Sequence, residues 1–268
     1  MNIVIIGGGY LGQLLHSLIP SARVLDWRPV SEKGYPLPRN FGPQYLWRPI
    51  PGLYNDSFTV VTTVDGMPAT QESILAYKRK VGKQQDQSDW RTQFQQTMNG
   101  FEVHLPPDRV EYGMRVVRVN CLDKYLICAN GHRVDYNWLI STIPLPELLK
   151  LCAIGISETF ESRPIYVTSE PVEPLSYLSV NYLSDPFNIA YRETIRNGQL
   201  HRESLDALPN SRVLRPGKIY RNGQAAHHLA ELLMYKIKSV GRYGSWNPEE
   251  LAHETYSELR TWKEIINL

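Results

Sequence analysis

The sequence has few cysteines and no long run of apolar residues. Its 268 residues include only 3 cysteines, which show neither the spacing of metal ligands nor a framework for disulfides. We therefore expect a reducing, cytoplasmic setting. No segment approaches the ~18 consecutive apolar residues of a membrane-spanning helix, and the apolar start lacks the basic residues that open a signal peptide. The sequence predicts no membrane partner and no bound metal.

A strong charge of either sign is also missing. Lys and Arg number 29 and Asp and Glu number 27, which gives a formal net charge of +2. This balance argues against a protein whose whole surface binds nucleic acid. One local basic cluster stands at Lys78–Lys83. Two interpretations of it stay open: a solvated helix face, or a binding site for an anionic partner, either a nucleotide sugar or a nucleic acid. The oligomeric state is not predicted.

Several motifs of catalysis are absent as well. The sequence contains no H-E-x-x-H, no G-x-S-x-G, no P-loop and no C-x-x-C. Catalysis by a metal ion or by a serine or cysteine nucleophile is therefore disfavoured.

The sequence does have a glycine-rich opening, VIIGGGYLGQLL. Residues 3–6 form a short apolar run that is typical of a strand buried on both faces. Residues 10–18 carry apolar side chains at helical spacing, and residues 22–27 predict a second strand. Gly7, Gly9 and Gly12 between them satisfy G-x-G-x-x-G, whose glycines allow a tight turn, the approach of a pyrophosphate and close helix–strand packing.

An acidic residue completes this pattern. Asp26 follows Gly7 by about 20 residues, at the end of the second predicted strand, where a carboxylate can accept hydrogen bonds from an adenosine ribose. The segment therefore predicts dinucleotide binding. Arg28 lies close by, and it either contacts a phosphate, signals a preference for NADP or is a surface residue.

The rest of the chain does not continue as parallel β–α units. Residues 28–55 predict a long loop rich in proline and aromatic residues, and Asn130-Gly131 predicts a hairpin turn within a β-meander over 110–134. Helical patterns cover residues 69–98, 146–151, 224–239 and 248–264. Further strands are predicted at residues 58–64, 138–142, 165–168, 177–183 and 189–194.

Four segments resemble the flavoproteins related to UDP-galactopyranose mutase, protoporphyrinogen oxidase and the amine oxidases. They are the opening, NFGPQYL at 40–46, LISTIPLP at 139–146 and VGRYGSW at 240–246. A weaker likeness joins Asn181-Tyr182, Asp185 and Tyr191-Arg192 to the mutase stretch whose arginine lies beside the flavin ring. The resemblance implies FAD rather than NAD. It also implies an α/β fold with a Rossmann-like FAD-binding domain and a second, smaller α+β substrate domain.

The resemblance further implies domain boundaries and site residues. The FAD-binding domain would comprise residues 1–55, 106–155 and 215–268, and the substrate domain residues 56–105 and 156–214. Arg192 and Tyr191 are the catalytic candidates, with Arg192 expected to stabilise negative charge on the reduced flavin or to hold an anionic substrate. The residues expected to contact FAD are Gly7, Gly9, Tyr10, Leu11, Gly12, Asp26, Trp27, Arg28, Phe41, Gly42, Val117, Thr142, Ile143, Gly241, Arg242, Gly244 and Trp246.

The implied function is that of an FAD-dependent oxidoreductase of the amine-oxidase type. It would accept a hydride from a C–H or C–N bond of a small or nucleotide-linked substrate. Three alternatives stay open: a non-redox sugar mutase, a flavoenzyme that acts on modified bases or amino groups in nucleic acid, and a non-catalytic dinucleotide-binding module. Gln44 stands where the mutase stretch has a histidine, which weakens a direct transfer of mutase activity.

Overall fold

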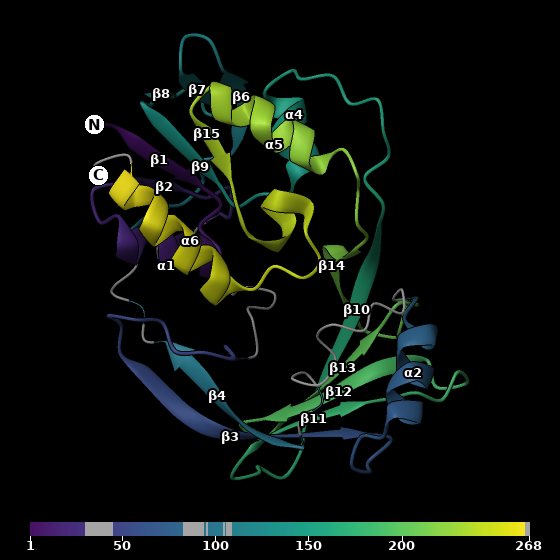
Figure 1. The fold of residues 1–268 in the computed structure, drawn as a ribbon. Helices are drawn as coiled ribbons and strands as arrows, with labels where there is room; N and C mark the ends of the chain where they lie inside the picture. Colours follow the sequence, from purple (N-terminus) through teal and green to yellow (C-terminus); the bar gives the residue numbers. More distant parts are fainter. Residues whose placement is uncertain (30–44, 83–93, 95, 104, 106–108, 266–268) are drawn as a thin grey trace.

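A five-stranded parallel sheet carries the glycine-rich opening (Figure 1). The computed structural model describes every residue except 30–44, 83–93, 95, 104, 106–108 and 266–268. Across the sheet the strands are β15 (Ile237–Ser239), β9 (Trp138–Ser141), β1 (Ile3–Ile6), β2 (Arg23–Leu25) and β5 (Val110–Glu111). Every neighbouring pair is parallel. All residues of the central strand β1 are buried, as its unbroken apolar run predicts.

Other elements cover both faces of this sheet. Ile3 and Ile5 of β1 pack into one apolar cluster with the helices on the first face, and Val4 and Ile6 pack into another on the opposite face. The first face is covered by α1 (Tyr10–Leu18) and α6 (Ala252–Ile265). The second is covered by α4 (Leu145–Leu151), α5 (Ala225–Met234) and a meander of β6 (Val116–Asn120), β7 (Tyr125–Cys128) and β8 (Arg133–Asp135). Within the described residues, no helix is long and apolar enough to cross a membrane.

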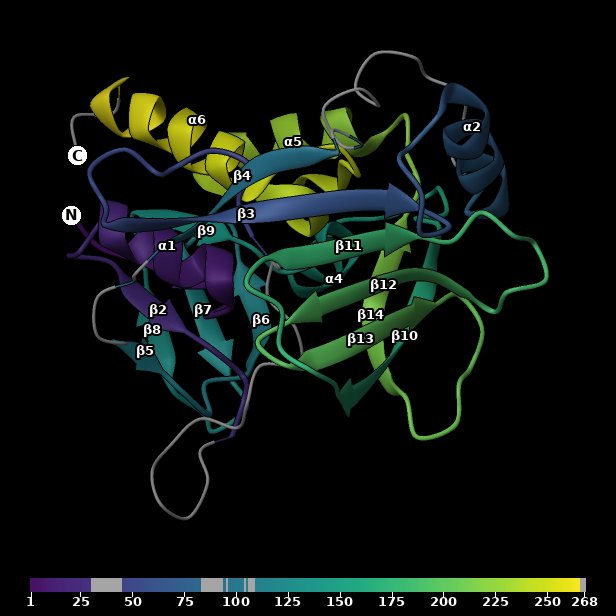
Figure 2. The same cartoon turned by 90° about the horizontal axis from the view of Figure 1, so that it is seen from below.

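A mixed, seven-stranded sheet forms the second part of the molecule (Figure 2). Its strands, in order, are β14 (Arg212–Ile219), β10 (Ser162–Pro171), β13 (Gln199–Ser204), β12 (Ala190–Arg196), β11 (Leu178–Tyr182), β3 (Asn55–Val64) and β4 (Thr97–Val103). β11 and β3 are parallel, and the other neighbours are antiparallel. The helix α2 (Gln71–Lys80) packs on this sheet through Ile74 and Tyr77.

The chain passes twice from the parallel sheet to the mixed sheet and back. β3 and β4 stand in the chain between β2 and β5, and β10 to β14 stand between α4 and α5. The long strands β10 and β14 join the mixed sheet to the region of α5 and η1 (Arg242–Trp246) (Figure 1). The structure thus confirms the predicted fold class, an α/β fold in which a Rossmann-like parallel sheet is joined by a second sheet of mixed strands.

Some predicted elements were wrong. The helical stretch predicted over residues 69–98, with a break near Gly82, does have a helix that ends at Lys80, but its last part was wrong because Thr97–Val103 pairs with β3. The helix predicted over 224–239 ends at Met234, because Lys236 with a φ of 62° turns the chain into β15. The strands β13 and β14 were not predicted. Short polar segments become strands here because a neighbouring strand pairs with them, which local sequence patterns do not reveal.

Replacing Leu139 should destabilise the parallel sheet strongly. Leu139 lies in β9 with no exposed surface, so Leu139→Ala leaves a cavity and should lower the free energy of unfolding by about 2–5 kcal/mol. Leu122→Ala is the control, because Leu122 is 81% exposed in a turn. Urea denaturation followed by tryptophan fluorescence measures both. Equal effects of the two substitutions would contradict the placement of β9 in the core.

Candidate functional site

The end of β1 is a tight turn that requires glycine. Gly7 has a φ of 97°, in the left-handed region that favours glycine, and a Cβ there would lie 2.3 Å from Thr142 Oγ1. Thr142, which follows β9, donates from Oγ1 to the Gly7 carbonyl over 3.0 Å. Its neighbour Ile143 lies within van der Waals reach of the same position. The predicted residues at the ends of β1 and β9 therefore lie together.

Close contacts at this turn require two further glycines, Gly12 beneath α1 and Gly8 beside Asp26 and Val110. A Cβ on Gly12 would lie 1.9 Å from the Gly7 carbonyl oxygen. The helix can therefore approach the turn only because residue 12 has no side chain. A Cβ on Gly8 would lie 2.8 Å from Asp26 Oδ2 and 2.6 Å from Val110 Cγ1. The motif leaves the second of its three consecutive glycines unspecified, and for this reason no role of Gly8 was predicted.

Gly9 differs from these glycines because it faces open space. A Cβ on Gly9 would meet no atom of the described residues within 4 Å. Gly9 is the N-cap residue of α1, no side chain caps that helix, and its first turn carries no acidic residue. The positive end of the helix dipole is therefore open to an anion, as in the pyrophosphate sites of dinucleotide-binding folds.

Asp26 lies at the end of β2 and is paired with Arg28. The carboxylate is 4% exposed, and Arg28 Nε and Nη2 donate to its two oxygens over 2.9 Å each. Arg28 Nη2 also donates to the Gly8 carbonyl over 2.8 Å, and the guanidinium lies 5.1 Å from the centre of the Tyr112 ring. Arg28 is thus an integral part of the turn and not a surface residue: only 14% of its side chain is exposed.

The other residues predicted to contact the cofactor near the glycine turn differ in their exposure to solvent. Trp27 is 65% exposed beside Asp26, and Val117 is 47% exposed at a register shift in β6. Tyr10 and Leu11 lie partly buried in the first turn of α1. Two predicted contacts, Phe41 and Gly42, lie outside the described residues, as does Gln44.

The segment after β15 approaches α1 closely. Gly241 has a φ of 79°, and a Cβ there would lie 2.2 Å from Leu11 Cδ2. The carboxylate of Glu250 accepts hydrogen bonds from the Gly241 backbone N–H over 2.8 Å and from Thr255 Oγ1 over 2.6 Å. Glu250 also accepts a bond from Ser245. Glu250 therefore holds the GRYGSW segment against α6, a role that the sequence did not suggest.

The GRYGSW segment forms η1, with side chains in different surroundings. Arg242 is exposed, whereas a Cβ on Gly244 would lie 3.0 Å from the Ser141 carbonyl oxygen. Trp246 is 3% exposed and packs edge-on against Phe160, with ring centres 5.2 Å apart. Trp246 is therefore a packed core residue in the described part of the chain.

Tyr243 of η1 connects the parallel sheet with the mixed sheet. Its hydroxyl donates to the Gly217 carbonyl in β14 over 3.0 Å. Burial raises the pKa of Tyr243, the Arg242 charge lowers it, and the negative charge of Glu203 in β13 raises it further. The GRYGSW segment and the face of the mixed sheet that carries Glu203 are thus close enough to interact electrostatically.

Glu203 binds both predicted catalytic residues. Arg192 Nε donates to Glu203 Oε1 over 3.1 Å, Arg192 Nη2 donates to the same oxygen, and the Tyr191 hydroxyl donates to Oε2 over 2.6 Å. Adjacent strand residues normally point to opposite faces. Here the register of β12 against β13 shifts between Ala190 and Arg192, and this bulge allows both side chains to reach one carboxylate.

Aromatic side chains surround this pair. Tyr77, Phe94 and Tyr182 form a cluster in which neighbouring ring centres lie 4.8 to 6.0 Å apart. Burial raises the pKa of Tyr182, while its hydrogen bond with Arg192 opposes the rise. Burial also raises the pKa of Tyr45 far above its usual value. These hydroxyls are therefore neutral and serve only as hydrogen-bonding groups.

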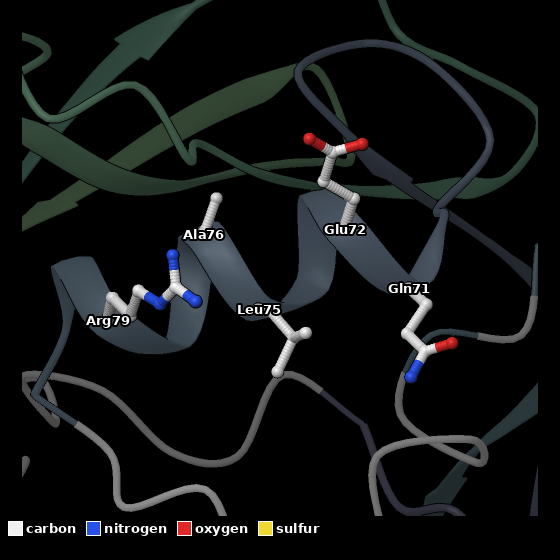
Figure 3. Close-up of a pocket in the computed structure, with 5 residues that line it drawn as sticks. All are labelled: Gln71, Glu72, Leu75, Ala76 and Arg79. Carbon is white, nitrogen blue, oxygen red and sulfur yellow. The ribbon is translucent and has the colours of Figure 1, made fainter.

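The basic cluster at Lys78–Lys83, of which Lys83 lies outside the described residues, is not a uniformly solvated face. Lys78 is 8% exposed, and Lys80 donates from Nζ to the Ala190 carbonyl over 2.7 Å. Arg79 is exposed and lines a surface hollow of about 460 Å³ on the outer side of α2 (Figure 3). The residues that line this hollow are Gln71, Glu72, Leu75, Ala76 and Arg79. Within the described residues, none of them belongs to the cluster around Glu203.

Removing the cation beside Asp26 should destabilise the turn. Arg28→Met leaves a buried carboxylate without its partner and should cost about 3 kcal/mol of unfolding free energy. The double substitution Asp26→Asn with Arg28→Met should recover much of this loss. Arg221→Met is the control and should change little, because Arg221 and Glu249 form an exposed pair with 63% and 57% of their side chains accessible. Chemical denaturation of the four proteins would contradict the account if Arg28→Met were neutral.

Comparison with known proteins gives a match at the level of the fold. No protein-family model and no curated protein matches the chain. Among solved structures, reduced UDP-galactopyranose mutase has a TM-score of 0.61 at 12% identity, covering 99% of this chain and 94% of that one. The CLA-producing fatty acid isomerase from P. acnes has a TM-score of 0.56 at 9% identity, covering 100% of this chain and 99% of that one. The chain therefore shares its fold with these two enzymes over its whole length.

Proposed function

We propose that this chain binds FAD and is a flavin-dependent oxidoreductase. The observation that carries the proposal is the cradle at Gly9, a helix N-terminus that, among the described residues, has no side-chain cap and no atom within 4 Å of a Cβ at Gly9. A dinucleotide pyrophosphate fits such a cradle because the phosphates need close backbone approach and a positive potential. The buried carboxylate of Asp26 stands nearby for the adenosine ribose.

Three features support FAD over a shorter or different dinucleotide. The sequence resembles flavoproteins in four segments, and the fold is that of UDP-galactopyranose mutase, one of those it resembles. The GRYGSW segment reaches from α1, through Gly241, to the mixed sheet, through Tyr243. Residues for a long cofactor are thus available from Asp26 at one end to Tyr243 at the other. Arg242 and Gly244 would serve the flavin end.

In the proposed reaction the cofactor would supply the redox chemistry, and side chains of the mixed sheet would hold the substrate. FAD, when bound, accepts a hydride, and the protein supplies binding, orientation and electrostatics. Arg192 and Tyr191 would orient the substrate through hydrogen bonds, and the rings of Tyr77 and Tyr182 would exclude water from it. We infer an amine-oxidase type of reaction, with hydride removal from a C–H or C–N bond of a small substrate.

A sugar mutase is the second candidate, favoured by the fold likeness to UDP-galactopyranose mutase. A mutase of this kind must hold a nucleotide diphosphate. The pairing of Arg192 with Glu203 speaks against such a role for Arg192, because a compensated guanidinium attracts a diphosphate weakly. Nucleic acid as a partner draws no support from Lys78 and Lys80, whose side chains are buried or bound to backbone.

The substitution Gly9→Ala separates cofactor binding from folding. Its Cβ would enter open space at an ordinary φ of −61°, so the stability should change by less than about 1 kcal/mol. The same methyl would occupy the approach path of the pyrophosphate, so affinity for FAD should fall at least about tenfold. Gly155→Ala is the matched control, since Gly155 also faces open space but lies far from the turn in the sequence.

The measurement is the visible absorption of the purified proteins, followed by titration of the apoproteins with FAD. We expect flavin bands in the wild type and in Gly155→Ala, and their loss or reduction in Gly9→Ala. A colourless wild-type protein that takes up NAD(H) but not FAD would refute the proposal. Unchanged FAD affinity of Gly9→Ala would refute the placement of the pyrophosphate.

A further inference from the structure

The Arg192–Glu203 pair, which includes a predicted catalytic residue, carries no net charge. Glu203 is 7% exposed, and 32% of the Arg192 side chain is accessible. Burial lowers the pKa of Arg192, but the Glu203 charge beside it holds the pKa well above its usual value. Arg192 is therefore always a cation, and the carboxylate beside it compensates that cation.

The strand register and the hydrogen bonds hold Arg192 and Glu203 together. Arg192 and Glu203 are directly opposed residues of β12 and β13, and two guanidinium nitrogens bind the same carboxylate oxygen. The other oxygen is taken by the Tyr191 hydroxyl. Each partner is thus held by the sheet register as well as by its own hydrogen bonds, and neither can turn away without leaving a buried polar group unpaired.

The pair still offers hydrogen-bond donors. A guanidinium has five N–H groups, of which Glu203 and Tyr182 engage only a part. Tyr182, which bonds to Arg192, packs against the rings of Tyr77 and Phe94, so aromatic surface lies beside these donors. An anion at this place would lose its hydration and gain little from a compensated cation, whereas an uncharged acceptor loses far less.

Among the described residues, the other cationic side chains near the Arg192–Glu203 pair do not add a free positive charge beside it. Lys80 faces the charges of Asp185 and Asp65 and donates its own hydrogen bond to Ala190. Arg242 is exposed on η1, where the proposed function assigns it to the cofactor.

We propose that Glu203 is a positioning residue which fixes Arg192 and cancels its charge, so that the site selects an uncharged polar group on an aromatic or apolar substrate over a carboxylate or phosphate. This inference rests on the proposed function, and it gives that function a substrate class. A neutral amine is such a group, and it is also the form of an amine from which a hydride leaves readily.

Three small aromatic ligands of nearly equal shape test the charge of the site. Benzamide is neutral, benzoate is an anion and benzamidine is a cation at neutral pH. Isothermal titration calorimetry on the flavin-loaded protein measures each affinity. The wild type should bind benzamide at least about tenfold more tightly than either ion.

Substitution of either partner should change this preference in a defined direction. Glu203→Gln leaves Arg192 uncompensated and should raise the benzoate affinity at least about tenfold. Arg192→Gln leaves Glu203 uncompensated and should raise the benzamidine affinity instead. The double substitution should again prefer benzamide. Glu193→Gln is the matched control. Glu193 follows Arg192 in β12 and pairs with Arg202, which precedes Glu203 in β13. Loss of the Glu193 charge should leave all three affinities unchanged.

Each result decides the inference. Tighter binding of benzoate than benzamide by the wild type overturns it, as does a Glu203→Gln protein whose benzoate affinity is unchanged or undetectable. If Glu203→Gln does not fold, the rise in benzamidine affinity on Arg192→Gln decides in its place. The flavin absorption of the same samples separates the two claims. A protein without flavin refutes the proposed function and this inference with it, and a yellow protein with unchanged benzoate affinity refutes only the inference.

Discussion

The close approach of bare backbone around the end of β1 is the constraint on which the rest of the structure depends. Gly12 lets α1 approach the Gly7 carbonyl, and Gly241 lets the GRYGSW segment approach Leu11 of the same helix. A Cβ on Gly12 would meet backbone and push α1 away from β1, whereas at Gly241 the φ of 79° disfavours any other residue and the Leu11 side chain would have to shift. Because α1 stays close, its N-terminus opens directly at the carboxyl edge of the parallel sheet. The ends of β2, β9 and β15 lie at that edge, and each contributes residues there.

The mixed sheet holds a group of hydrogen-bonded polar side chains next to aromatic side chains. The bulge in β12 allows Tyr191 and Arg192 to reach the same carboxylate, and Glu203 in β13 satisfies both. The aromatic cluster of α2 and β11 then surrounds a network that is polar but uncharged overall. The Tyr243 hydroxyl bonds to Gly217 in β14, and this contact joins η1, which follows β15 of the parallel sheet, to the mixed sheet.

The sequence predicted the first of these arrangements far better than the second. The unbroken apolar run of residues 3–6 and the spacing of glycines specify β1, the turn and α1 locally, and all three lie where they were predicted. Glu203 and Glu250 gave no signal, because their roles arise from partners distant in the sequence. The strands β13 and β14 were missed for the same reason: their pairing with β10 and β12 is a tertiary property. The resemblance to flavoproteins singled out Arg192, but it did not indicate that a carboxylate neutralises it.

The central claim is that one long cofactor reaches from the glycine turn to the mixed sheet. A crystal structure of the protein with its bound cofactor tests this most directly. The account predicts electron density for FAD with its pyrophosphate at Gly9, its ribose at Asp26 and its flavin ring between the GRYGSW segment and the Arg192–Glu203 pair. Density for a dinucleotide whose second half turns away from η1, or an empty cradle at Gly9 in a protein that retains flavin elsewhere, would contradict it.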